Sequence, residues 1–248
     1  MEFEMTRLDS QLRLDSPRVN IFRSSVENQV KTIIPVCLTL FKITKCTLYV
    51  EQGTLTESKK FLEVLKGTYT IVTFQDRCFT RSRERANPEN VLDAFRQVQE
   101  IWVKCSHRGA LSKSTIRPLQ FERLNLSKAN WVNIKHLTSL FIDCKFVVLS
   151  DCVLTNREFR TFLERWMKGS DMRKLSIRCT GFNMRSIVRG LEATPVVGRI
   201  VIDNCVYIMT EGECYTIQQQ NGLQAVVYNE YSIGQLVGFR LSTNFTIS

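Results

Sequence analysis

Residues able to perform catalysis are few and scattered in this sequence. The chain has only two histidines, His107 and His136, and neither has a nucleophile and an orienting carboxylate at a recognisable spacing. We therefore expect both histidines to lie in loops or at the surface. The motifs of phosphate-binding loops, zinc proteases and nucleophile elbows are also absent from the sequence. The residues argue against an enzyme and predict no catalytic site.

The cysteines are typical of buried thiols in a reducing compartment. There are nine of them, an odd number, and no CxxC pair occurs. Cys144 and Cys152 are eight residues apart, which suits core packing better than a compact metal site. We expect no metal, no cofactor and a cytoplasmic or nuclear location.

The residue types that remain are those of protein interfaces. Tryptophan, arginine and lysine alternate with apolar residues in several short segments, and such residues dominate interaction hot spots. We expect these side chains to line the concave face of a sheet and to bind a protein; the alternative is a solvated face with no ligand. The candidates are Trp102, Lys104, Arg123, Asn125, Lys174, Ser176, Arg178, Arg199 and Asp203.

Charge and hydropathy limit the other classes of partner. The formal net charge is +10, but the basic residues are spread along the chain. The densest cluster, at 80–88, includes Glu84 and falls in a predicted loop. A nucleic-acid surface is therefore the alternative rather than the preferred interpretation. The longest apolar run, 33–41, contains Pro35 and is far shorter than the roughly 20 residues that cross a bilayer, so no membrane association is expected.

The elements that would position the candidate residues are clearest at 154–179. Thr155 and Glu158 have the spacing of a capping box, which predicts the start of a helix. An apolar stripe from Phe159 to Met167 follows, and Gly169 ends the helix. Alternation at Leu175–Ile177 then predicts a strand. The unit is helix, turn, strand.

A similar apolar pattern recurs along the chain. Segments starting at 43, 69, 98, 121, 144, 172 and 197 have apolar residues at the first, fourth and sixth positions, and the steps between them are 23 to 29 residues. Helical spacing occurs at 24–37, 61–67 and 88–98. We therefore predict an α/β fold: a degenerate leucine-rich-repeat-like solenoid, in which helices back a curved parallel sheet. Asn221-Gly222 predicts a β-hairpin, and thus a C-terminal antiparallel β extension.

Three segments define the expected domain organisation. Residues 1–23 form an N-terminal leader, residues 24–205 the α/β domain, and residues 206–248 a β-hairpin cap. The cap is expected because a terminal repeat exposes an apolar side.

Part of the chain resembles the F-box-associated domain of type 2 from nematode F-box proteins. The resemblance is carried by LNLSKANWVNIKHL at 124–137, FVVLSDCVLTNREFRTFLERWMKGSD at 146–171 and the following RKLSI. It implies a substrate-recruiting module of a cullin–RING ubiquitin ligase, whose partner is a protein still to be identified.

The leader departs from this family plan. Residues 1–23 are too few and too polar for the roughly 40–50-residue F-box helices that the resemblance implies, so ligase coupling is in doubt. The ligase adaptor would be a partner only if a cryptic F-box exists. The alternatives are a basic nucleic-acid-binding protein and a non-functional truncated family member.

Overall fold

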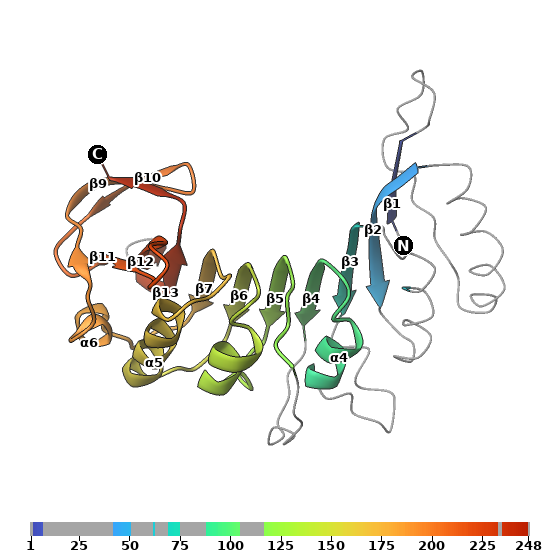
Figure 1. The fold of residues 1–248 in the computed structure, drawn as a ribbon, viewed down its shortest axis with the longest axis horizontal. Coiled ribbons are helices and arrows are strands. Elements are labelled where there is room, and N and C mark those ends of the chain that lie inside the picture. Colours follow the sequence, from blue (N-terminus) through green and yellow to red (C-terminus); the bar gives the residue numbers. More distant parts are fainter. Residues whose placement is uncertain are drawn as a thin grey trace. The chain divides into compact units, whose positions relative to one another are not determined.

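The structure is a computed structural model that describes residues 2–6, 42–50, 62, 69–74, 88–104, 117–232 and 235–247. The chain falls into two compact units, Met1–Cys105 and Ser106–Ser248, which are described in turn (Figure 1). The domain limits predicted from the sequence are a different division and stay a prediction.

The described residues of the first unit include four strands and a short helix. Strand β1 (Glu2–Thr6) pairs antiparallel with β2 (Lys42–Val50), and β2, β3 (Tyr69–Phe74) and β4 (Glu100–Lys104) are parallel. Helix α4 (Pro88–Ala94) begins where the helical spacing at 88–98 begins, with a proline at its first position. The predicted helices at 24–37 and 61–67 lie outside the described residues, except for the buried Leu62.

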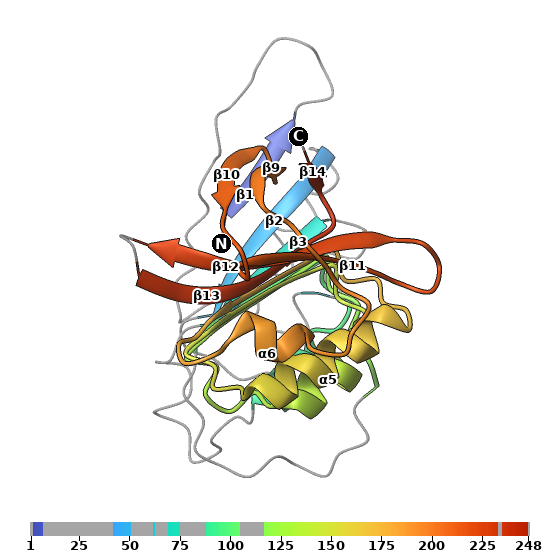
Figure 2. The same ribbon diagram turned by 90° about the vertical axis from the view of Figure 1, so that its left-hand side faces the viewer.

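The second unit begins with three parallel strands, β5 (Arg123–Ser127), β6 (Phe146–Ser150) and β7 (Lys174–Arg178). A π-helical turn, η1 (His136–Leu140), connects β5 to β6, and α5 (Asn156–Met167) connects β6 to β7. A five-residue helix, α6 (Met184–Val188), follows. Figure 2 shows α5 and α6 together on one side of the strands.

Helix α5 forms for the local reasons that the sequence gives. The Glu158 amide donates to Thr155 Oγ1 at 3.3 Å, and the Thr155 amide donates to Glu158 Oε2 at 2.8 Å, so the predicted capping box is present. Its stripe of Phe159, Phe162, Leu163 and Trp166 is fully buried. Each of these side chains contributes about 1.5–3 kcal/mol by leaving water, and together they hold the helix on the sheet.

The rest of the second unit is antiparallel. β13 (Gln235–Ser242) pairs with β7, β12 (Gln224–Ser232) pairs with β13, and β11 (Cys214–Gln218) pairs with β12. The two-residue β8 (Thr194–Pro195) completes the order β5-β6-β7-β13-β12-β11-β8. A separate sheet has the order β10-β9-β14, with β9 (Gly198–Ile202), β10 (Cys205–Met209) and β14 (Phe245–Ile247). The hairpin predicted at Asn221-Gly222 joins β11 to β12.

The predicted leucine-rich-repeat-like solenoid is wrong: the described fold is a mixed, β-rich one. The strands occur where the apolar pattern predicted them, but in the second unit the parallel run ends at β7 and the sheet continues through antiparallel strands. Strand β9, expected as the seventh repeat strand, lies in the separate sheet. Only a π-helical turn stands between β5 and β6, where a repeat would need a backing helix.

Turn geometry explains why β9 is followed by an antiparallel neighbour rather than by another parallel strand. Asp203 and Asn204 both have positive φ, 50° and 66°, which is the conformation of a two-residue hairpin turn. The chain therefore reverses, and β10 pairs antiparallel with β9 from Cys205 opposite Ile202. A parallel neighbour would have required a crossover of a dozen or more residues.

Candidate functional site

One face of the mixed sheet in the second unit carries most of the predicted binding residues. Along β5, β6 and β7 one set of side chains, such as Leu124, Val147 and Leu175, is fully buried, and the alternate side chains point the other way. The buried face is the one that carries α5, because Phe239, which pairs with Ile177 of β7, contacts Phe159 of α5. Strand β13 also contributes to the opposite face. We call that opposite face the open face; its side chains are those of Arg123, Asn125, Phe146, Val148, Lys174, Ser176, Arg178 and Arg240.

Strand register aligns these side chains in rows across the sheet. Asn125, Val148, Ser176 and Arg240 occupy successive paired positions on β5, β6, β7 and β13. In the neighbouring row, the Arg123 guanidinium lies over the ring of Phe146, 5.4 Å from its centroid. The sheet therefore presents both apolar and cationic groups along one surface.

Two ion pairs anchor the cations nearest to β12 and to the second sheet. Lys174 Nζ is 2.8 Å from Asp203 Oδ2, and Ser242 Oγ donates to the other oxygen of Asp203 at 3.1 Å. Arg240 is paired with Glu230 of β12, with its Nε donating to Glu230 Oε2 at 2.8 Å. These side chains are partly buried, so they are held more rigidly than ordinary surface pairs.

The open face has an excess of positive charge. Four cations, Arg123, Lys174, Arg178 and Arg240, lie on it, and the two carboxylates just described contact it. Lys174 and Arg240 use those carboxylates, and Arg178 adds an exposed cation at the last position of β7. Such a surface favours a partner that brings acidic groups.

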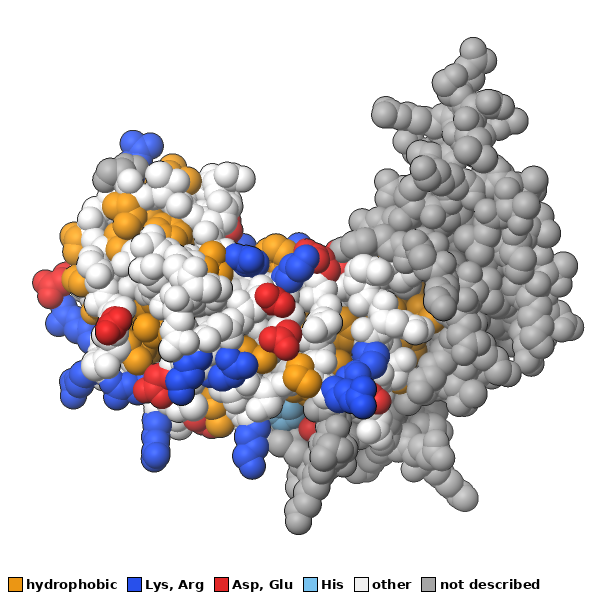
Figure 3. Space-filling view, in the orientation of Figure 1, with side chains coloured by type: hydrophobic (Ala, Val, Ile, Leu, Met, Phe, Trp, Pro, Cys, Tyr) orange, Lys and Arg blue, Asp and Glu red, His pale blue; other side chains and the backbone are white. Residues whose placement is uncertain are grey.

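The second sheet covers the far end of the mixed sheet on the same side as the open face. Ile200, Ile202 and Met209 pack against Val226 and Tyr228 of β12 in one buried cluster. Figure 2 shows β9, β10 and β14 on the side of the strands opposite to α5. In Figure 3, lysine, arginine and acidic side chains lie next to the hydrophobic ones over this part of the molecule.

The open face of the second unit contains some, but not all, of the predicted site residues. Arg123, Asn125, Lys174, Ser176 and Arg178 share the open face, although Ser176 is only 2% exposed. Asp203 reaches the same face from the β9–β10 turn, through Lys174.

Three predicted residues lie elsewhere. Trp102 and Lys104 belong to β4 of the first unit, where they alternate with the buried Ile101 and Val103, and Trp102 is 42% exposed. Arg199 pairs with Ile208 on the outer face of the second sheet. It therefore points away from the core that contains Ile200.

The sequence interpretation missed Arg240, Glu230, Phe146 and Val148. Arg240 stands between the buried Phe239 and Leu241, an alternation that indicates a strand. This local pattern does not indicate that β7 is the neighbouring strand. The pairing of β13 with β7 is thus what adds Arg240 to the site.

The nucleophilic and titratable side chains outside the open face have structural roles. His136 was predicted to lie in a loop or at the surface, and this is wrong: it begins η1, it is 4% exposed, and its Nδ1 accepts from the Asn133 amide at 3.0 Å. Its ring lies 5.3 Å from Trp131 and 5.8 Å from Phe141. His107 lies outside the described residues.

The described cysteines form no ligand cluster. Burial raises the pKa of Cys144 and of Cys152 to about 12, so both thiols are held neutral. Among the described residues no group of three or more His, Cys, Asp and Glu side chains has a geometry that could hold a metal ion.

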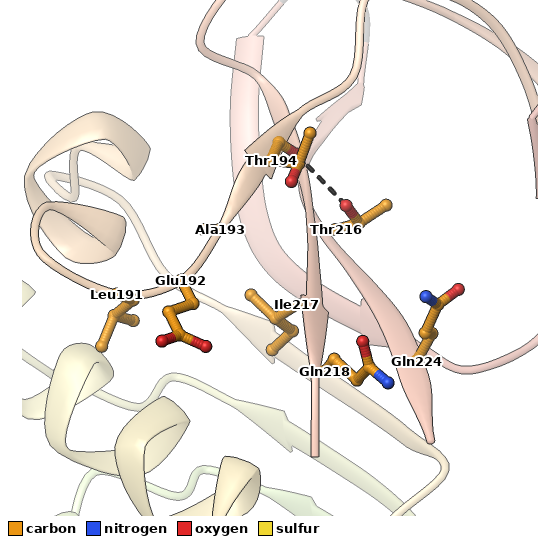
Figure 4. A pocket seen from close by; sticks show the side chains of 8 residues that line it. All are labelled: Leu191, Glu192, Ala193, Thr194, Thr216, Ile217, Gln218 and Gln224. Carbon is orange, nitrogen blue, oxygen red and sulfur yellow. Dashed lines mark hydrogen bonds between the residues drawn. The ribbon is translucent and has the colours of Figure 1, made fainter. Parts of the chain in front are cut away.

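A shallow pocket near β8 offers little chemistry. It has a volume of about 430 Å³ and is lined by Leu191, Glu192, Ala193, Thr194, Thr216, Ile217, Gln218 and Gln224 (Figure 4). Thr216 Oγ1 donates to the Thr194 carbonyl at 3.4 Å, and Glu192 is the one carboxylate in the lining. One carboxylate among amides and hydroxyls does not make an acid–base pair.

The parallel strands of the open face fall in a recognised family segment. Residues 114–177 match the family model described as F-box associated. This range contains β5, β6, α5 and all of β7 except its last residue. The predicted resemblance to the F-box-associated domain is therefore confirmed for this segment.

A curated relative extends the likeness. The Skn-1 dependent zygotic transcript 15 protein of Caenorhabditis elegans is 30% identical over 106 residues, which are 42% of this chain. The matched region is 30% of the relative, so the chain spans less than a third of the length of that protein. No solved structure matches the chain.

In the part of the chain that the structure describes, no helix is long and apolar enough to cross a bilayer.

Proposed function

We propose that the chain is a protein-binding module that holds its partner on the open face, and that it serves as the substrate-recruiting part of an F-box type receptor of a cullin–RING ubiquitin ligase. The observation that carries the proposal is the coincidence of the F-box-associated match with β5, β6 and β7, which supply most of the open face. An F-box-associated segment is consistent with a substrate-binding role, which supports the first part of the proposal.

The chemistry of the open face suggests the kind of partner. Phe146 and Val148 are half-buried and leave apolar area to cover, while Arg123 and Arg178 flank them with positive charge. The preferred partner is a protein segment in which apolar side chains stand beside aspartate or glutamate. Trp102 and Lys104 of β4, in the first unit, are proposed as partner-binding residues in their own right.

Affinity capture from a nematode extract tests the proposal. The tagged chain is compared with Arg178→Glu, which reverses the charge on the open face, and with Trp102→Ala. Arg157→Glu is the matched control, because Arg157 is an exposed arginine of α5 on the helical side of the sheet. A partner that is recovered by the chain and by the control, but at least 10-fold less by Arg178→Glu, supports the open face.

Two additional readouts separate the parts of the proposal. Scoring the ligase adaptor in the same captures tests the link to the ligase independently of substrate binding. Repeating the capture after nuclease treatment tests the nucleic-acid alternative, because partners held through RNA or DNA are then lost. Equal recovery of every partner by Arg178→Glu and the chain would contradict binding at the open face.

A further inference from the structure

The outer face of the β10-β9-β14 sheet is apolar where a half-buried sheet is normally polar. One face of this sheet packs Ile200, Ile202 and Met209 into the core. The opposite face of an antiparallel sheet of this kind usually carries polar residues towards water. Here it carries Val206, which is 57% exposed, and Ile208, which is 71% exposed.

Cross-strand pairing gathers these side chains into one patch. Val206 lies directly opposite the half-buried Val201, and Ile208 lies opposite Arg199. Val197, just before β9, is 62% exposed. We call this group the outer patch; it consists of Val197, Arg199, Val201, Val206 and Ile208. Figure 3 shows hydrophobic side chains gathered over the region of β9 and β10.

The outer patch adjoins a strand edge without the usual protection. Natural edge strands are kept from pairing by charged residues, proline or a bulge. Strand β10 reads CVYIM, has no charge and no proline, and pairs with β9 in unbroken register. Within the described residues, β9 is its one strand partner. An exposed apolar face next to an unprotected edge marks an interaction surface.

Arg199 indicates what the partner must carry. Its side chain is exposed at the centre of the patch, and no carboxylate of the described residues contacts its guanidinium. A partner that covers the neighbouring valines and isoleucine also removes this cation from water. Because a buried charge is costly unless it is paired, the covering surface needs a carboxylate at this position.

We propose that the outer patch is a second protein-docking surface, distinct from the open face, and that it takes a partner segment whose apolar side chains flank an aspartate or glutamate. A second copy of the chain fits less well. The patch carries a cation and no carboxylate, so pairing two copies face to face would enclose two guanidinium groups with no counter-charge.

The test uses a random twelve-residue peptide library displayed on phage and selected on the full chain. Binding of the enriched peptides is then measured on Val206→Lys and on Ile208→Lys. The control is Val153→Lys, because Val153 is an aliphatic residue that is 81% exposed outside the patch. All three positions face water, so lysine there leaves the fold intact, which circular dichroism verifies.

We expect enriched peptides with a carboxylate between aliphatic residues, and binding to Val206→Lys and Ile208→Lys at least 10-fold weaker than to Val153→Lys. Selection on Arg199→Glu should instead enrich lysine or arginine at the central position. Three results would overturn the proposal: no enrichment, enriched peptides that bind Val206→Lys as well as they bind the chain, or enrichment without a carboxylate. Self-association in sedimentation that Val206→Lys abolishes would also overturn it, in favour of a second copy.

Discussion

The aromatic contact between α5 and β13 allows a direct energetic test of the mixed sheet. Phe159 of α5 and Phe239 of β13 are both fully buried, and their ring centroids are 4.7 Å apart. Phe239 also pairs across the ladder with Ile177 of β7. In a solenoid with a separate C-terminal cap these two rings would not meet. Replacing them singly and together therefore measures a contact that only the observed fold contains.

The expected magnitudes follow from burial and ring geometry. Phe239→Ala removes a buried phenyl group, and such changes cost about 3–5 kcal/mol because of lost transfer energy and the cavity that remains. That is a large share of a total stability of about 5–15 kcal/mol. Leucine is a gentler replacement, so the double-mutant cycle uses Phe159→Leu and Phe239→Leu. Stacked or tilted rings at this distance give a coupling of about 0.5–1.5 kcal/mol.

Urea unfolding, followed by far-ultraviolet circular dichroism, supplies the four free energies of unfolding. Phe121→Leu combined with Phe239→Leu is the control cycle: Phe121 is also fully buried but precedes β5, which is three strands, about 14 Å, from β13. We expect additivity within about 0.3–0.5 kcal/mol in the control cycle. The same additivity in the Phe159–Phe239 cycle would refute the packing of α5 against β13.

Four further predictions concern individual side chains. Thr155→Ala should lower the free energy of unfolding by about 1 kcal/mol, measured by urea denaturation, because it removes the N-cap of α5. Gly238→Ala should destabilise by about 1–3 kcal/mol in the same assay, since a Cβ there would meet the Ile177 carbonyl oxygen at 2.7 Å; an unchanged midpoint would contradict the close approach of β13 to β7. At pH 8 a thiol reagent should modify the exposed Cys205 and spare Cys144. Burial raises the pKa of Cys144 from 9.0 to about 12, so the contribution of its neutral thiol to the free energy of unfolding is complete below pH 9 and is lost as the pH rises towards 12. Burial also raises the pKa of Cys152 to about 12, so the stability of Cys144→Ala should still fall over this range, but less steeply than that of the unchanged chain.

Local patterns in the sequence predicted the elements better than their pairing. Apolar alternation at Leu124 and Leu126 identifies both a strand and its buried face, because side chains alternate with a period of two. The capping box of α5 is likewise a short-range interaction. Neither signal says which strand is the neighbour, so a series of similar strands was interpreted as one repeated stack.

The candidate site depends on contacts between residues far apart in the chain. Arg240 joins the open face only because β13 returns to pair with β7. Asp203 reaches Lys174 from the hairpin turn after β9, in the sheet that packs on β12. Arg199 does not lie on the open face, because in β9 it alternates with Ile200, whose side chain faces the core. The residue types alone indicated the basic residues of β5 and β7. The pairing of strands far apart in the chain determines which other residues join them on the open face.

Photo-cross-linking tests the central claim, that the open face of the F-box-associated segment holds a protein partner. A photoreactive phenylalanine analogue is placed at position 178 or 125 on the open face, or at the exposed Glu164 of α5 on the helical face. After irradiation in a nematode extract, we expect the variants at positions 178 and 125 to form an adduct with the same protein, and the variant at position 164 to form none. An adduct from 164 alone would contradict it.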